Sequence, residues 1–246
     1  MTTGIARAFY GACYYLSWLW FAAGALALNA ACVPLLLIRG NPRAGALVRG
    51  AIRRLFSLWG WWLDWSGVVR IDWLGFDRPL TPGTVYVANH PTLVDATVLL
   101  SRLPDAICVM KPSLMRNPFT GPAAIAAGYV VFGKTVDGVR DAAAKVAAGK
   151  SLLIFPEGTR TPDGTVLGPM VHGFLMSAER ARAPVELIVV KASPGLGRKG
   201  RAWWRLPAVL PATITVTQDR RWEWDGRRSS AELLLELEGR MKAVLD

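Results

Sequence analysis

The sequence predicts an α/β fold behind an apolar N-terminal segment. Two short apolar runs, Thr84–Ala88 and Ser151–Ile154, each end in a turn that carries ionisable residues. Short runs of apolar and β-branched residues bounded by turn signals are typical of buried strands. Helical patterns at 96–100 and 139–148 lie beside them, and strands that alternate with helices favour a sheet with parallel strands.

The apolar segment at the N-terminus carries no charge from residue 8 to residue 38. As one helix it would be about 45 Å long, more than the roughly 30 Å hydrocarbon layer of a bilayer, and it is too long for a signal peptide. We expect a retained membrane anchor, either one tilted span with an interfacial end or two helices broken between Gly24 and Pro34. Arginines follow at 39, 43, 49, 53 and 54, so the positive-inside rule puts the body on the cytoplasmic side, as at a bacterial inner membrane.

Residues 44–65 combine arginines with four tryptophans and several leucines. This pattern favours an amphipathic helix that lies at the membrane interface, although an ordinary helix covering the core would show much the same residues. We therefore assign residues 1–66 to anchoring and interfacial helices and residues 67–246 to one folded domain.

The rest of this domain is also expected to contain both strands and helices. Ser229 and Glu232 form a capping-box signature that opens a C-terminal helix ending at residue 245. A further helix is expected over Val171–Arg182. Additional strands are expected at 68–74, 106–110, 184–190 and 212–217.

The charge balance narrows the range of partners. The formal net charge is +11, and Arg7 is the only charged residue among residues 1–38. A basic body suits an anionic membrane surface, an acidic carrier protein or nucleic acid, but no zinc-finger spacing, aromatic RNA-binding motif or basic repeat supports nucleic acid. With His90 and His172 as the only histidines, no metal-ligand cluster is expected. The three cysteines are expected to be reduced thiols.

The first candidate site is the stretch N-H-P-T-L-V-D, residues 89–95. His90 is placed at a strand end, where side chains can face a cleft, and Asp95 in the first turn of the next helix. The carboxylate can hold one imidazole nitrogen and leave the other as a base for a substrate hydroxyl. A single histidine near a helix cap is better explained as structural, so the interpretation as a base depends on a second motif.

That second motif is F-P-E-G-T-R, residues 155–160, directly after the strand Ser151–Ile154. Parallel strands end at the same edge of a sheet, so both motifs should meet there. Arg160 offers a planar fork for a phosphate, and Gly158 lets a ligand approach the backbone.

Together the two motifs resemble those of the glycerolipid acyltransferases. The resemblance covers most of residues 68–190 and implies a central mixed sheet flanked by helices, as in glycerol-3-phosphate acyltransferase. It implies that His90 and Asp95 are catalytic. It also implies that an anionic acceptor is bound by Lys111, Arg116, Glu157, Gly158, Thr159 and Arg160, and we expect Glu157 to orient Arg160 or a substrate hydroxyl. The sequence departs from the family pattern at Lys134, His172 and Leu187.

The implied reaction moves a fatty-acyl group from a thioester to the hydroxyl of a lysophospholipid, with 1-acyl-glycerol-3-phosphate as the acceptor and phosphatidic acid as the product. No cofactor is expected beyond the co-substrate, acyl-coenzyme A or acyl carrier protein. The basic, tryptophan-containing stretch 195–205 could contact a carrier protein or the membrane. Two alternatives stay open, namely an aminoacyl or polyketide-like lipid as acceptor, and a non-catalytic membrane-binding relative.

Overall fold

The structure is a computed structural model that describes residues 4–38, 40–131, 136–162, 164–171, 173, 175–224 and 229–246. The expectations for Arg39, Lys134 and His172 concern residues outside these ranges.

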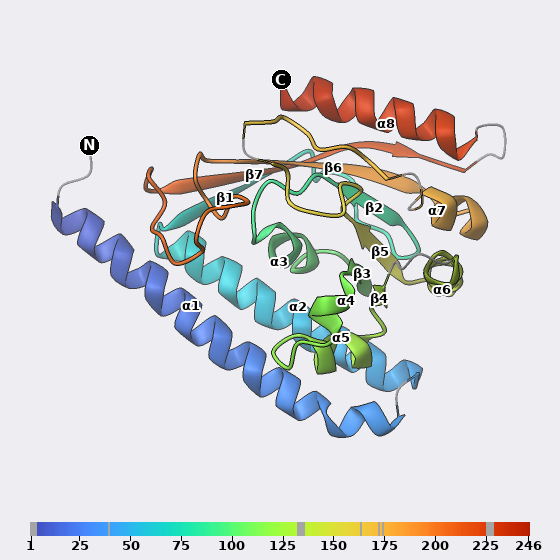
Figure 1. Cartoon of the computed structure of the whole chain (residues 1–246), viewed down its shortest axis with the longest axis horizontal. Helices are drawn as coiled ribbons and strands as arrows, with labels where there is room; N and C mark the ends of the chain where they lie inside the picture. The colour runs from blue at the N-terminus through green and yellow to red at the C-terminus, as the bar shows by residue number, and fades with distance from the viewer. Residues whose placement is uncertain are drawn as a thin grey trace.

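A seven-stranded mixed sheet forms the centre of the molecule (Figure 1). Its strand order is β1-β7-β6-β2-β5-β3-β4, with every neighbouring pair parallel except β6 and β7. The predicted mixed α/β sheet is thus confirmed. The strands are β1 (Val69–Leu74), β2 (Val85–Ala88), β3 (Ala106–Met110), β4 (Val130–Val131), β5 (Ser151–Ile154), β6 (Val185–Ala192) and β7 (Ala212–Trp222).

The register of the central strands aligns their ends. Val87 of β2 is paired with Ile154 of β5, and Leu153 of β5 is paired with Cys108 of β3. All side chains of β2 and β5 are buried, which explains why these strands appear in the sequence as continuous apolar runs. The carboxyl ends of β2, β5 and β3 therefore lie side by side.

Helices cover both faces of the sheet. Figure 1 shows α8 on one face, with α2, α3 and α5 on the other and α1 alongside α2. The helices are α1 (Gly4–Cys32), the 3-10 helix η1 (Pro34–Ile38), α2 (Pro42–Trp65), α3 (Asp95–Leu100), α4 (Pro112–Met115), α5 (Gly121–Ala127), α6 (Asp137–Ala147), α7 (Leu175–Ala181) and α8 (Ser230–Leu245).

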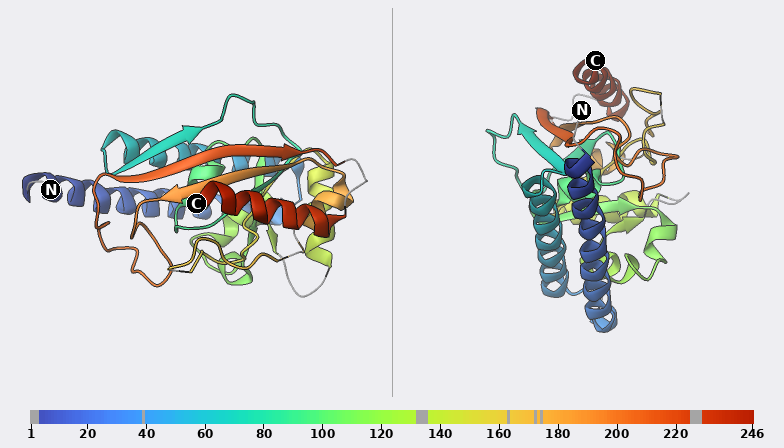
Figure 2. Two further views of the ribbon diagram at one scale, coloured as in Figure 1. Left: turned by 90° about the horizontal axis from the view of Figure 1, so that it is seen from above. Right: turned by 90° about the vertical axis from the view of Figure 1, so that its left-hand side faces the viewer.

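The apolar N-terminal segment forms one long helix, α1, with 29 residues. Within the described ranges it is the one helix long and apolar enough to cross a membrane. It is therefore a single helix followed by the short η1, not two comparable helices. Its N-terminal end projects beyond the body (Figure 2), while Trp18 and Phe21 pack against Trp59 of α2 with ring centroids 5.4 and 4.7 Å apart.

Helix α2 begins with a side-chain cap, since Asn41 Oδ1 accepts the backbone N–H groups of Arg43 and Ala44. One face of the helix covers the core with buried Val48, Ile52, Trp59 and Leu63, and the other exposes Leu47, Leu58, Trp61 and Trp65. The helix thus covers the core and also presents apolar side chains outward. It ends next to the predicted domain boundary, between α2 and β1.

Two element predictions need correction. The helix expected over Val171–Arg182 runs over Leu175–Ala181 as α7, and Val171 before it is joined through its backbone N–H to the carbonyl of Pro156 in the second motif. The last strand, β7, continues to Trp222, since it pairs along its length with β6. The capping box of Ser229 and Glu232 is confirmed at the start of α8.

Candidate active site

The carboxyl ends of three adjacent parallel strands carry the predicted site residues. His90 follows β2, residues 157–160 follow β5, and Lys111 follows β3. An edge of this kind is where open α/β sheets bind ligands. The structure thus brings both sequence motifs to one edge.

His90 and Asp95 form a hydrogen-bonded pair with 2.8 Å between Nδ1 and Oδ2. The Asp95 carboxylate is fully buried, whereas the His90 side chain is 19% exposed. The same carboxylate accepts the backbone N–H of Thr92 at 2.7 Å and the Thr92 hydroxyl. Because an ionised carboxylate can only accept, Nδ1 carries the hydrogen and Nε2 keeps its lone pair for a substrate.

Packing fixes the plane of the imidazole ring. Phe155 stacks on His90 with 4.2 Å between ring centroids and 22° between the planes. The preceding residue, Asn89, uses its side-chain amide to bind both the carbonyl and the N–H of Val190, at 2.8 and 2.7 Å. The asparagine of the first motif therefore ties the end of β2 to β6, which holds the adjacent histidine in place.

Glu157 has a different position from the one expected. Its Oε1 accepts the backbone N–H of His90 and the hydroxyl of Thr161, both at 2.9 Å. Its Oε2 accepts the backbone N–H of Gly168 at 2.8 Å. The expectation that it orients Arg160 is wrong, since among the described residues no bond joins the two, and Glu157 is only 6% exposed. Its carboxylate instead holds the two motifs together.

The turn after Glu157 presents a backbone open to a ligand. Gly158 has a φ of 62°, a left-handed conformation that favours glycine, and its N–H closes the turn onto the Phe155 carbonyl at 3.0 Å. Nothing lies within 4 Å of the position that a Cβ would occupy. Thr159 beside it is half-buried.

Arg160 reaches a segment distant in sequence. One of its terminal nitrogens, Nη1, donates to the carbonyls of Gly197 and Arg198 at 2.8 and 3.2 Å. These belong to the connection between β6 and β7, residues 193–211, which we call the β6–β7 loop. Because these bonds engage one terminal nitrogen, the other terminal nitrogen of the guanidinium is left for a ligand.

The two other predicted cations differ in placement. Lys111 is exposed at the junction of β3 and α4, on the same edge as His90. Arg116 is exposed at the far end of α4, where its Nε lies 3.5 Å from the Pro112 carbonyl of the same turn. The structure therefore brings Lys111 to the edge, and no described contact brings Arg116 there.

The β6–β7 loop also covers the turn that carries His90. A Cβ on Gly197 would lie 3.0 Å from the Leu93 backbone nitrogen, and the φ of Gly197 is 55°, so the close approach and the left-handed backbone both favour glycine here. Farther along, the Trp203 carbonyl accepts the Tyr14 hydroxyl, and the Trp203 ring packs on Trp18 at 5.3 Å. A narrow apolar cavity lies between the loop, the first two helices and Val94.

Several site residues had no clear signal in the sequence. Thr161 donates its backbone N–H to the His90 carbonyl at 2.8 Å, and Gly168 binds Glu157. Both are held by contacts that form only when the chain folds. Thr92 could have been found, because a threonine three positions before an aspartate commonly shares its carboxylate in a local turn.

Comparison with known proteins agrees with this geometry. The family model described as Acyltransferase matches residues 77–191. This range is slightly less than half of the chain. The matched range contains both motifs, β2 to β5 and all of β6 but its last residue, with α1, α2, β1, the β6–β7 loop, β7 and α8 outside it.

Named relatives share part of this domain. A 1-acyl-sn-glycerol-3-phosphate acyltransferase of Cocos nucifera is 29% identical over 139 residues, which cover 54% of this chain and 43% of that protein. One of Helicobacter pylori is 28% identical over 116 residues, 45% of this chain and 49% of that protein. The matches thus span about half of these relatives or less.

A solved structure matches the chain at greater length. The 1-acyl-sn-glycerophosphate acyltransferase PlsC of Thermotoga maritima superposes with a TM-score of 0.72 at 21% identity, covering 98% of this chain and 95% of that chain. At this identity the likeness establishes the fold, which includes the range matched by the family model and the helices in front of it.

Proposed function

We propose that this chain transfers a fatty-acyl group from a thioester to the free hydroxyl of 1-acyl-glycerol-3-phosphate and so forms phosphatidic acid. The observation that carries the proposal is the pair of His90 and Asp95, 2.8 Å apart at the ligand-binding edge of the sheet. The names of the relatives from Cocos nucifera and Helicobacter pylori, both 1-acyl-sn-glycerol-3-phosphate acyltransferases, support the choice of acceptor.

The reaction needs a base and no nucleophilic side chain. His90 Nε2 takes the proton from the acceptor hydroxyl as its oxygen attacks the thioester carbonyl. The new C–O bond forms, the C–S bond breaks, and the proton passes from His90 to the departing thiolate. Asp95 keeps Nδ1 protonated and stabilises the imidazolium that forms between these steps.

The acceptor phosphate is expected near the turn after β5. Arg160 has donors left after its bonds to the β6–β7 loop, the Gly158 backbone is open, and Lys111 lies on the same edge. An arginine fork suits a phosphate better than a single ammonium does. We keep Arg116 as a more distant contact, and Glu157 as the residue that positions the turn.

Membrane association follows from the two N-terminal helices. Helix α1 exposes apolar side chains such as Ile5 and Leu19, and α2 exposes Leu58, Trp61 and Trp65. We propose that the body lies on the cytoplasmic face of a bacterial inner membrane, with an anionic lipid surface beneath it. As acyl donor, the chain uses acyl carrier protein thioesters at least as well as acyl-coenzyme A. No further cofactor is needed.

The test uses the full chain purified in detergent micelles with lysophosphatidic acid and an acyl thioester. The amount of free thiol released should equal the amount of phosphatidic acid formed. Both should require lysophosphatidic acid. Replacing His90 with Ala should lower turnover on the order of 10²–10⁴-fold, the range for a lost general base, without changing the melting temperature by more than a few degrees. Thiol release that does not depend on lysophosphatidic acid, or near-normal turnover by His90→Ala, would refute the proposal.

A further inference from the structure

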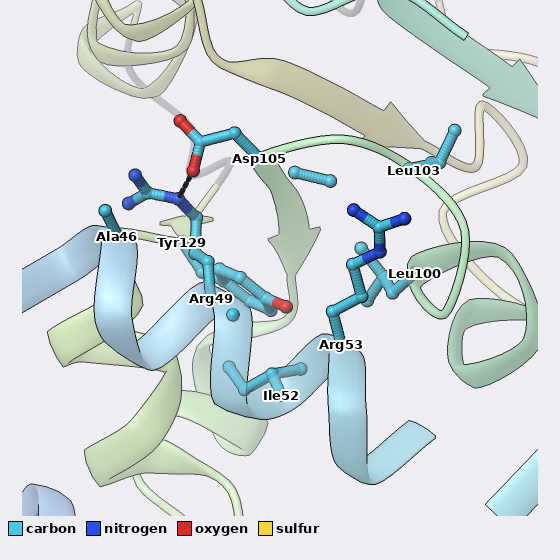
Figure 3. Close-up of a pocket in the computed structure, with 10 residues that line it drawn as sticks. Ala46, Arg49, Ile52, Arg53, Leu100, Leu103, Asp105 and Tyr129 are labelled. Carbon is cyan, nitrogen blue, oxygen red and sulfur yellow. Dashed lines mark hydrogen bonds and ion pairs between the residues drawn. The ribbon is translucent and has the colours of Figure 1, made fainter. Parts of the chain in front are cut away.

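A polar cavity (Figure 3), distinct from the apolar one beside Val94, lies at the opposite edge of the sheet from His90. It has a volume of about 130 Å³ and is lined by residues that include Arg49, Arg53, Leu100, Leu103, Asp105 and Tyr129. Asp105 precedes β3, whereas His90 follows β2. Since β2 and β3 both run parallel to β5, the cavity and the acyl-transfer site are at opposite ends of the strands.

Arg49 forms a fixed wall of this cavity. It is only 6% exposed, its Nε pairs with Asp105, and its Nη1 donates to the Ala127 carbonyl at 2.9 Å. Figure 3 shows this ion pair on one side of the cavity. The charge of Arg49 is therefore balanced by Asp105, which leaves the charge of the cavity to be decided by other residues.

Arg53 supplies a charge that is not balanced. It lies one turn beyond Arg49 on α2, and Figure 3 shows its guanidinium beside Leu100 and Leu103, on the side of the cavity away from Asp105. Its Nε is 3.3 Å from the Ser101 carbonyl, and no carboxylate among the described residues pairs with it. Arg49, Asp105 and Arg53 together leave a net charge of +1.

Tyr129 adds a neutral donor. The side chain is buried, with 9% exposed, and no described residue hydrogen-bonds its hydroxyl, which extends toward Ile52 and Arg53 in Figure 3. Burial raises the pKa of this phenol, so the hydroxyl keeps its proton. A hydroxyl that lines the cavity without a partner in the protein can donate to a ligand or a water there.

We propose that this cavity binds a phosphate group, with Arg53 and Tyr129 as the donors that hold it. A net positive charge and donors in excess of acceptors favour an anion, and an arginine fork matches phosphate oxygens in particular. The group comes either from an anionic lipid or from a soluble phosphate ester. Its position at the far edge of the sheet makes it separate from the reacting acceptor.

The experiment measures the melting temperature of the full chain in neutral detergent micelles. Inorganic phosphate and glycerol 3-phosphate are titrated against sodium chloride at equal ionic strength, and phosphatidic acid in the micelle against diacylglycerol. Variants Arg53→Gln and Tyr129→Phe are compared with Arg54→Gln, which removes the same charge from an exposed position that does not line the cavity. Arg49 is left unchanged, because its loss would leave Asp105 unpaired.

At least one phosphate probe should stabilise the wild type and Arg54→Gln equally. Arg53→Gln should bind it about tenfold more weakly, the loss expected for one charge-assisted hydrogen bond, and Tyr129→Phe should weaken it less. Stabilisation by phosphatidic acid alone identifies a lipid ligand, and stabilisation by the soluble probes identifies a phosphate ester. If no probe exceeds sodium chloride, or if Arg53→Gln and Arg54→Gln behave alike, the cavity holds only water and the proposal is wrong.

Discussion

The carboxylate of Glu157 accepts the backbone N–H of His90 at 2.9 Å, across 67 positions of sequence. The backbone N–H of Thr161 donates to the His90 carbonyl. Glu157 and Thr161 therefore bind both the N–H and the C=O group of the His90 backbone. The second motif therefore acts on the first through the main chain. This accounts for an acidic residue beside a proposed phosphate site, where a free carboxylate would repel the ligand.

Replacing Glu157 with Gln should slow the reaction mainly through kcat. An amide cannot accept at both ends, so either the His90 N–H or the Gly168 N–H would lose its acceptor. A buried donor without a partner costs about 1–3 kcal/mol, and the melting temperature should fall accordingly. Steady-state kinetics with lysophosphatidic acid check this, and a raised acceptor KM with unchanged kcat and stability would instead place Glu157 on the substrate.

Replacing Asp95 with Asn should be nearly as severe as removing His90. The amide would leave Nδ1 of His90 without a reliable acceptor, and the other tautomer, with its proton on Nε2, would become favoured. Turnover should drop by on the order of 10²–10⁴-fold. Thr92→Val, which removes the hydroxyl bond to Asp95 but keeps its backbone bond, is the milder control. If Asp95→Asn retained more activity than Thr92→Val, the tautomer argument would fail.

Replacing Arg160 with Lys should raise the acceptor KM and leave the donor KM little changed. One ammonium can replace the contact with a loop carbonyl or with a phosphate, but it cannot reproduce the two-pronged geometry. The comparison requires separate titrations of lysophosphatidic acid and of the thioester. A rise in the donor KM alone would assign Arg160 to the thioester.

The exposed apolar side chains of α2 should make membrane binding resistant to salt. Replacing Leu58, Trp61 and Trp65 together with Ser should lower binding to anionic vesicles by on the order of 10²-fold or more in high salt, since each buried side chain contributes about 1.5–3 kcal/mol. Arg43→Ser, at another exposed position of α2, should lower binding in low salt only. Flotation of the anionic vesicles measures how much of each variant is bound at low and at high salt. Deleting residues 1–38 is a less direct test, because it would also uncover Trp59.

The cations of the β6–β7 loop should distinguish the two donors. Changing Arg198, Lys199, Arg201 and Arg205 to Ser should slow the reaction with acyl carrier protein, chiefly at low salt, and spare the reaction with acyl-coenzyme A. A carrier protein needs an extended basic face for docking, whereas coenzyme A does not. Equal losses with both donors would mean that the loop serves folding or membrane binding.

Much of this architecture could be predicted because its signals are local. Strands β3 and β5 were predicted with the bounds that the structure gives, and His90 and Asp95 are only five positions apart in the sequence. The role of Glu157 could not be predicted, since its partners at 90 and 168 meet only in the folded sheet. The same holds for Arg160, whose carbonyl partners come from a loop of irregular backbone that no periodic pattern marks.

The bond from Tyr14 to the Trp203 carbonyl joins α1 to the loop that Arg160 contacts. On the proposed function, this tie holds the acceptor edge at a constant height above the bilayer. A lysolipid can then reach His90 by lateral diffusion, without leaving its leaflet. The turnover rate should follow the mole fraction of lysolipid in the surface and be insensitive to dilution of the vesicles. The chain would in this way catalyse a reaction whose acceptor behaves as a solute in two dimensions, confined to the surface of the bilayer.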